Sequence, residues 1–350
     1  MAEYISFQPS DYFNTKIYTG TGSSNAITGV GFQPDLIWIK NRDAADWQIW
    51  TDSVRGTDYN IYSNDLNAQE NYTTRVQSFD ADGFTLGTQA EVNTNTEDFA
   101  SWNWKGGTTS GIATNGSTTI TPSAYSFNQT SGFSIIQYTG NGVAGAKIAH
   151  GLGATPNMII VKKTSSTADW CMYHQRIDST APEDYNIKLN TTAARSNNSS
   201  FWNDTVPDSV NFTIGDSGDL NSDTTTNIAY CFAEKKGYSK MGSYTGNGNA
   251  DGTFVYTGFR PGCIMMKRTN GTPNWMLYDS KREGYNQENA YLEPNTNQEE
   301  YLTVDIDILS NGFKIRDTAT SVNGTPDPYI FSAFAEFPIV SSNDIPGVAR

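Results

Sequence analysis

The chain has 350 residues, a formal net charge of −14 and a sequence pI near 4.5. This acidic balance, with Lys and Arg scattered along the chain, argues against nucleic-acid binding, which needs a basic stripe. No apolar run is long enough to span a bilayer, so membrane insertion is not expected. The N-terminus lacks the basic start and apolar core of a signal peptide, which predicts synthesis in a reducing cytoplasm.

Residues 1–15 are expected to form an N-terminal arm. The arm contains apolar clusters around Tyr4 and Tyr12 and precedes the first strand-like segment. We expect it to pack on the first repeat or on a neighbouring subunit.

A unit of about a hundred residues then occurs three times, which is domain size. Each copy has a Tyr-Thr-Gly-x-Gly turn, an apolar run that ends in Lys, and a Trp a few positions later. Tyr to Lys is 22, 24 and 23 positions, and Lys to Trp is 7, 8 and 8. The tyrosines and lysines that mark the copies are Tyr18 and Lys40, Tyr138 and Lys162, and Tyr244 and Lys267.

The spacing divides the chain into repeat 1 (16–106), repeat 2 (132–237) and repeat 3 (238–338). Residues 107–131 are rich in Gly, Ser and Thr and are expected to form a linker with little to bury. Repeats 2 and 3 follow each other directly, so we expect a fixed orientation between them. Residues 339–350 are expected to form a surface tail.

Each repeat contains six or seven strand-like segments separated by turn signals, and no long helical periodicity is visible. The predicted fold class is all-β: three tandem antiparallel β-sandwiches, jelly-roll or immunoglobulin-like. Aromatic residues at recurring positions are expected to fill the three cores. These residues are Trp47, Trp170 and Trp275, then Phe84, Phe212 and Phe313, and finally Trp104, Phe232 and Phe334.

Catalytic chemistry is poorly supported, and no cofactor is predicted. The two histidines, His150 and His174, have no nucleophile or metal-ligand motif beside them. Asp305 and Asp307 share a strand face, but the other repeats have nothing that matches them. We expect solvated or structural roles for all four residues, with a glycan depolymerase as a remote alternative.

Two tryptophans have no Trp counterpart in the other repeats, Trp38 and Trp202. Such aromatics are candidates for stacking on a sugar, and Trp202 lies in an Asn/Ser-rich, loop-like run. The alternative is that Trp202 is a hydrophobic plug beneath that loop.

A polar loop clusters Asp216, Asp219 and Asp223, which are oxygen ligands of the kind that calcium prefers. The spacing matches no EF-hand, so a plain surface loop is the favoured interpretation and no metal is predicted. The three cysteines fall in unmatched positions, which predicts buried free thiols and no disulfide.

The chain resembles a family of virion proteins from tailed bacteriophages, common in marine phages. The resemblance covers nearly the whole chain. It rests on Phe7-Gln8-Pro9-Ser10-Asp11-Tyr12-Phe13, the Tyr-Thr-Gly-x-Gly turns, the Pro-x-x-Ile-x-x-Lys runs, and Ser101-Trp102-Asn103-Trp104-Lys105-Gly106-Gly107. It implies a tail-fibre or other virion structural protein, made in the host cytoplasm, and it provides no catalytic residue to carry over.

We therefore expect a non-catalytic protein on the virion surface, as a tail fibre, a head fibre or a capsid decoration. Other virion proteins are the expected partners, and a homo-oligomer is expected, with a trimer favoured. The alternative is a carbohydrate-binding adhesin that attaches to host surface polysaccharide. In that case, exposed aromatic and amide side chains would make the contact.

Overall fold

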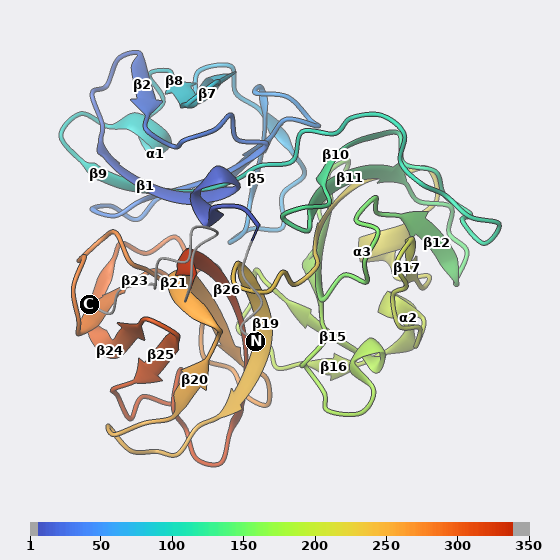
Figure 1. Ribbon diagram of the computed structural model, residues 1–350. Helices are drawn as coiled ribbons and strands as arrows, with labels where there is room; N and C mark the ends of the chain where they lie inside the picture. The colour runs from blue at the N-terminus through green and yellow to red at the C-terminus, as the bar shows by residue number, and fades with distance from the viewer. Residues whose placement is uncertain (1–5, 339–350) are drawn as a thin grey trace.

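The computed structural model describes residues 6–338, and its architecture is all-β with antiparallel sheets (Figure 1). The α-helices of this range are single turns of four residues. No helix in it has the length and apolar character needed to cross a membrane. The chain forms three lobes around a common centre, blue to cyan, green to yellow, and orange to red in Figure 1.

The first lobe has a six-stranded sheet in the order β1-β9-β3-β4-β5-β6 and a three-stranded sheet, β2-β8-β7. Its elements are η1 (Pro9–Asp11), β1 (Phe13–Thr19), β2 (Asn25–Thr28), β3 (Leu36–Asn41), β4 (Ile49–Asp52), β5 (Tyr59–Tyr62), β6 (Glu70–Asn71), β7 (Val76–Asp80), β8 (Gly83–Leu86), α1 (Ala90–Asn93) and β9 (Asp98–Trp104).

The second lobe has a seven-stranded sheet, β10-β11-β18-β13-β14-β15-β16, and a small sheet, β12-β17. Its elements are β10 (Ala124–Asn128), β11 (Phe133–Thr139), β12 (Ala146–Ala149), β13 (Met158–Lys163), β14 (Trp170–His174), η2 (Pro182–Asp184), β15 (Tyr185–Lys188), β16 (Ser196–Asn197), α2 (Ser199–Trp202), β17 (Asn211–Ile214), α3 (Gly218–Asn221) and β18 (Thr226–Phe232).

The third lobe has two four-stranded sheets, β19-β26-β21-β22 and β20-β25-β24-β23. Its elements are β19 (Ser239–Thr245), β20 (Phe254–Tyr256), β21 (Phe259–Arg268), β22 (Met276–Asp279), β23 (Glu288–Tyr291), β24 (Tyr301–Leu309), β25 (Gly312–Ile315) and β26 (Pro328–Pro338).

One sheet in each lobe, here called the large sheet, contains the same strand order: β1-β9-β3-β4, β11-β18-β13-β14 and β19-β26-β21-β22. The Tyr-containing strand pairs with the last strand of the lobe. The strand with the recurring Lys lies between that last strand and the next one. The register also recurs, because Lys40, Lys162 and Lys267 lie opposite Ala100, Ile228 and Ile330 of the last strands. The repeated sequence spacing therefore corresponds to a repeated pairing scheme.

The segment 107–131, expected to be a linker, contributes to the second lobe. Its β10 pairs with β11, and Ile120 bridges to Ile148 and is buried. The apolar residues spaced through this Gly/Ser/Thr-rich run are enough to anchor it. The N-terminal arm also differs from expectation, because β1 begins at Phe13; residues 1–5 and the tail 339–350 lie outside the described residues.

Each lobe buries a core cluster between its two sheets, and Phe84, Phe212 and Phe313 lie in these three cores. A fourth cluster joins the lobes at the centre of the molecule. There Trp104, Phe232 and Phe334 meet, with ring centroids 6.2, 5.4 and 5.6 Å apart. Residues at one repeat position thus build the contact between the lobes, and the large sheets are covered on both faces.

The lobes are also joined by a closed ring of hydrogen bonds. Each lobe donates from one side-chain N–H group to a backbone carbonyl of another lobe: Gln48 Nε2 to Glu293 O (3.1 Å), Trp170 Nε1 to Asp65 O (3.2 Å) and Trp275 Nε1 to Lys188 O (3.0 Å). Because the first lobe donates to the third, the third to the second and the second to the first, no lobe is an end of the array.

Candidate functional site

The recurring Tyr-Thr-Gly-x-Gly turns have structural roles. The hydroxyls of Tyr18, Tyr138 and Tyr244 each donate to a backbone carbonyl at 2.8 Å. In the first turn, a Cβ on Gly20 would lie 2.0 Å from the carbonyl oxygen of Thr94, so only glycine fits there.

The recurring lysines are fully buried, and they donate to backbone carbonyls at loop ends. Burial lowers the pKa of Lys40, Lys162 and Lys267 to about 8 in each case. Because solvent does not reach these amines, they can act on no substrate, and we assign them to the fold.

The two histidines are buried, and each lies within hydrogen-bond distance of a backbone carbonyl. His150 Nε2 is 3.0 Å from Asp208 O, and His174 Nε2 is 3.1 Å from Phe331 O. Burial lowers the pKa of both to about 4, so both imidazoles are neutral near pH 7. These contacts fix backbone segments and supply no general base to a surface site.

Two predicted sugar-stacking residues are closed to solvent. Trp38 is 3% exposed in the central cluster, where its Nε1 donates to Gln48 Oε1 at 2.9 Å. Trp202 is 1% exposed and packs edge-on against Tyr173 in the second core. The expectation of sugar stacking is therefore wrong for both, and Trp202 is a hydrophobic plug at the end of α2.

The acidic loop around Asp216, Asp219 and Asp223 includes the one-turn helix α3. Across residues 6–338, the structure brings together no group of three His, Cys, Asp or Glu side chains able to hold a metal ion.

The expected core position of Trp47 is also wrong. Strand pairing places Lys162 opposite Trp170 and Met266 opposite Met276, which sets Lys267 opposite Trp275. The same register sets Lys40 opposite Gln48. Gln48 thus occupies the buried Trp position of the first lobe, and Trp47, one residue earlier, points to the other face with 37% of its surface exposed.

The exposed Trp47 borders an open cleft of about 540 Å³ between the first and third lobes, here called the Trp47 cleft. The indole lies against Tyr62, with ring centroids 5.2 Å apart. The rest of the lining is dominated by amides and carboxylates: Asn64, Asp65, Asn274, Glu293, Asn295, Thr296, Asn297, Gln298 and Tyr301.

Several polar groups in the Trp47 cleft are held in place by the fold. Asn64 Oδ1 accepts from the backbone N–H of Gln48 at 3.0 Å, and Asn295 Nδ2 donates to Asn274 Oδ1 at 2.7 Å. Burial raises the pKa of Glu293. Asn297 and Gln298 are exposed on the rim, where Gln298 Nε2 donates to Asn297 Oδ1 at 3.3 Å.

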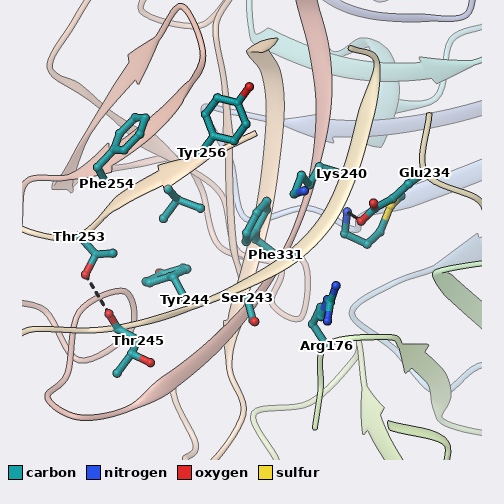
Figure 2. A pocket seen from close by; sticks show the side chains of 13 residues that line it. Arg176, Glu234, Lys240, Ser243, Tyr244, Thr245, Thr253, Phe254, Tyr256 and Phe331 are labelled. Atoms are coloured by element: carbon teal, nitrogen blue, oxygen red, sulfur yellow. Dashed lines mark hydrogen bonds between the residues drawn. The ribbon is translucent and has the colours of Figure 1, made fainter. Parts of the chain in front are cut away.

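A second concavity of about 570 Å³, the β19–β20 groove, lies between the outer strands of the two sheets of the third lobe (Figure 2). Its floor contains Tyr244, Val255 and Phe331, and its rim has two exposed aromatics. Those rim residues are Phe254 and Tyr256, 45% and 57% exposed. From the second lobe, Arg176 and Glu234 approach the groove on the side opposite these rings, as Figure 2 shows.

No His or Cys lines either concavity, so neither offers a Ser–His or Cys–His nucleophile pair. The Trp47 cleft does contain two carboxylates, Asp65 and Glu293. Amides beside an exposed aromatic ring, and the apolar floor of the β19–β20 groove, are features that also occur in binding sites.

Sequence reasoning missed a buried asparagine that recurs in all three lobes. Asn93, Asn221 and Asn323 each accept from the backbone N–H that follows the first Gly of the turn, at 2.9 Å, and donate to two carbonyls. The asparagines follow Phe84, Phe212 and Phe313 by 9, 9 and 10 positions, so their spacing could have found them.

Comparison with known proteins gives a family and no function. No curated protein matches the chain, and no solved structure does. One family model, described as a domain of unknown function, DUF7483, matches residues 8–338. That single match spans all three lobes. The chain therefore belongs to the DUF7483 family.

Proposed function

We propose that this chain is a non-catalytic structural protein of tailed-bacteriophage virions, displayed on the particle surface, that contacts host surface glycans through the Trp47 cleft. The phage part rests on the sequence resemblance over nearly the whole chain. In this proposal the three lobes are tandem copies of one β-sandwich repeat, and the partners are other virion proteins. The trimeric assembly expected from the sequence stays a prediction, which light scattering of the purified protein tests.

The observation that carries the glycan part is the exposed indole of Trp47 beside a wall of amides and carboxylates. The faces of sugar rings carry C–H groups that stack on an aromatic ring, and their hydroxyls pair with amide and carboxylate groups. The lining of the Trp47 cleft offers both kinds of contact.

The junction at the Trp47 cleft also differs from the other two junctions between lobes. At the other two junctions the Trp at this register is buried, and its indole N–H closes the ring of bonds between lobes. In the first lobe Gln48 makes that bond, and Trp47 turns outward. A local departure from a repeated rule, with an apolar ring left in water, favours a functional reason.

The test compares Trp47→Ala with Tyr59→Ala, because Tyr59 lies in the same lobe with similar exposure (38%) and does not line the cleft. We expect the wild-type protein and Tyr59→Ala to bind host surface polysaccharide. Trp47→Ala should lose at least tenfold in affinity with an unchanged midpoint of unfolding. Gln298→Ala, on the rim, should weaken binding by a smaller factor. Equal binding by Trp47→Ala and wild type would refute the glycan site.

The location on the virion is tested separately. Mass spectrometry of purified particles should detect the protein, and its absence would refute the structural assignment. Deleting the gene then separates the alternatives, because an adhesin is needed for adsorption, whereas a decoration protein only stabilises the capsid. Release of reducing sugar from host polysaccharide would instead support the depolymerase.

A further inference from the structure

The second lobe shows how the space between its two sheets is closed at one edge. The segment 119–126 crosses from β12 to β11. The backbone N–H groups of Thr119 and Ile120 donate to Lys147 O at 2.9 and 3.0 Å, and that of Ser123 donates to Gln137 O at 2.8 Å. Ile120 is buried in the core cluster of this lobe. An extended segment thus covers both sheet edges and supplies an aliphatic side chain.

The third lobe has no preceding segment to do the same, because β19 begins seven positions after β18 ends. Strand register makes Ser243 the counterpart of Gln137 and Phe254 the counterpart of Lys147. Both Ser243 and Phe254 line the β19–β20 groove. The groove therefore lies where the second lobe holds residues 119–126.

The free edge of β19 is short. Met241 is capped on that side, because its N–H donates to Glu234 Oε1 at 2.7 Å and its carbonyl accepts from Gln175 Nε2 at 3.0 Å. Ser243 has the same parity, so its N–H and carbonyl also point away from β26. Within residues 6–338, neither main-chain group of Ser243 has a hydrogen-bond partner on that side. An added strand could pair with β19 there.

The side of the groove that faces the second lobe carries two basic side chains, Arg176 and Lys240, and one carboxylate, Glu234, which accepts from the N–H of Met241 and from Gln175 Nε2. In the described part of the chain, neither Arg176 nor Lys240 forms an ion pair, and Arg176 is exposed. This contrasts with the arginines that do form ion pairs, which are Arg42, Arg55, Arg75, Arg195, Arg260, Arg268, Arg282 and Arg316. In a chain with a net charge of −14, two unpaired cations beside an apolar groove indicate an acidic group on the occupant.

We propose that the β19–β20 groove binds an extended segment of a partner protein by strand addition to β19. The segment pairs with the main chain of Ser243. It places an aliphatic side chain against Val255 and Phe331, as Ile120 does in the second lobe, and an acidic side chain beside Arg176 and Lys240. This site is independent of glycan binding, because the Trp47 cleft lies at another junction.

The test selects linear dodecapeptides from a displayed random library on the full-length protein. Synthetic versions are then measured by fluorescence polarisation. Selected peptides should combine alternating aliphatic residues with an acidic residue. Binding should weaken at least tenfold with Ser243→Pro, which removes the free N–H, and with the double variant Phe254→Ala/Tyr256→Ala, which removes the rim. Arg176→Ala should weaken binding. It should also make the affinity less sensitive to salt concentration, because one charge pair is lost.

Trp47→Ala is the matched control and should bind the peptides like wild type, while the groove variants should keep any glycan binding. Peptide addition should also slow hydrogen exchange of the Ser243 amide. Three outcomes would overturn the proposal. Either no peptide is selected, or selected peptides bind the groove variants as well as wild type, or the protein self-associates through β19. The rim variant keeps the test decisive if Ser243→Pro does not fold.

Discussion

The hydroxyl of Tyr230 donates a 2.7 Å hydrogen bond to Asp52 Oδ2, and this bond joins the second lobe to the first. Asp52 is fully buried and also pairs with Arg55 at 2.6 Å. The matching position of the third lobe, Asp279, accepts from Trp102 Nε1 of the first lobe at 3.2 Å. The interfaces between the lobes thus contain buried, charge-assisted hydrogen bonds, which are costly to leave unmade.

Tyr230→Phe removes the hydroxyl and keeps the ring. We expect it to lower the free energy of unfolding by about 2 kcal/mol, because a buried carboxylate oxygen loses a donor. Urea unfolding measures this. Tyr285→Phe, at a residue 68% exposed, should change stability by less than about 0.5 kcal/mol. A Tyr230→Phe protein as stable as wild type would show that the bond contributes nothing.

Asn221→Ala should destabilise the second lobe strongly. The amide accepts from Asn141 N at 2.9 Å and donates to Val143 O and Gly215 O at 2.9 and 2.8 Å. Its removal strands three backbone groups, of which the Gly215 carbonyl is buried, so we expect a loss of about 2 kcal/mol in unfolding experiments. Asn297→Ala, at an exposed position, is the control and should leave the midpoint unchanged. Equal midpoints for the two variants would contradict the assigned role.

The buried lysines predict an unusual rise of stability with pH. Burial lowers the pKa of Lys162 to about 8 in the native state, against an ordinary value of 10.5 in the unfolded chain. Between these values the unfolded chain holds a proton that the native lysine has released. The free energy of unfolding therefore rises with pH, by at most about 1.4 kcal/mol per pH unit and per lysine.

Lys162→Met isolates this contribution from that of other titrating groups. The stability of wild type minus that of the variant should be flat below pH 7 and should increase from pH 8 to pH 9.5, as measured by urea midpoints. A difference that stays flat or falls over this interval would mean that the native amine keeps its proton and would contradict the lowered pKa.

The thiols should be inert in the native protein. Cys171, Cys231 and Cys263 are free and buried, and burial raises the pKa of Cys231 to about 12. A thiol-specific disulfide reagent at pH 8 should react with none of them until denaturant is added, and then with three. The unfolding midpoint should not respond to dithiothreitol. Rapid labelling without denaturant would contradict the buried placement.

Much of the fold could be predicted from the repeated spacing. The strands that contain Tyr18, Tyr138 and Tyr244, and their antiparallel pairing, follow from alternation and turn signals. The packing of the lobes against one another could not be predicted from the same signals. Trp104, Phe232 and Phe334 were expected to fill separate cores, and they meet at the centre because the large sheets bury both faces. Hydrophobic periodicity indicates which face of a strand is buried, but it does not indicate which part of the chain covers that face.

The candidate site was harder to predict. The Asn/Ser-rich run around Trp202 left two interpretations open, a sugar-stacking ring and a hydrophobic plug, and the structure shows the plug. The signal for Trp47 was present, since it follows Lys40 by 7 positions and the other two tryptophans follow their lysines by 8. In a strand, one residue of difference reverses the face. Gln48 stands at the eighth position, where it makes the bond that the other lobes make with Trp.

The outward orientation of Trp47 determines how many sites of this kind one chain carries, a number that the three similar lobes do not reveal. Three copies of one pairing scheme suggest a trivalent protein, yet the counterparts of Trp47 in the other lobes are Asp169 and Asn274. A ligand that needs this indole therefore meets one site per chain. Under the proposed virion role, avidity for a repetitive surface must then come from the number of chains on a particle and their spacing.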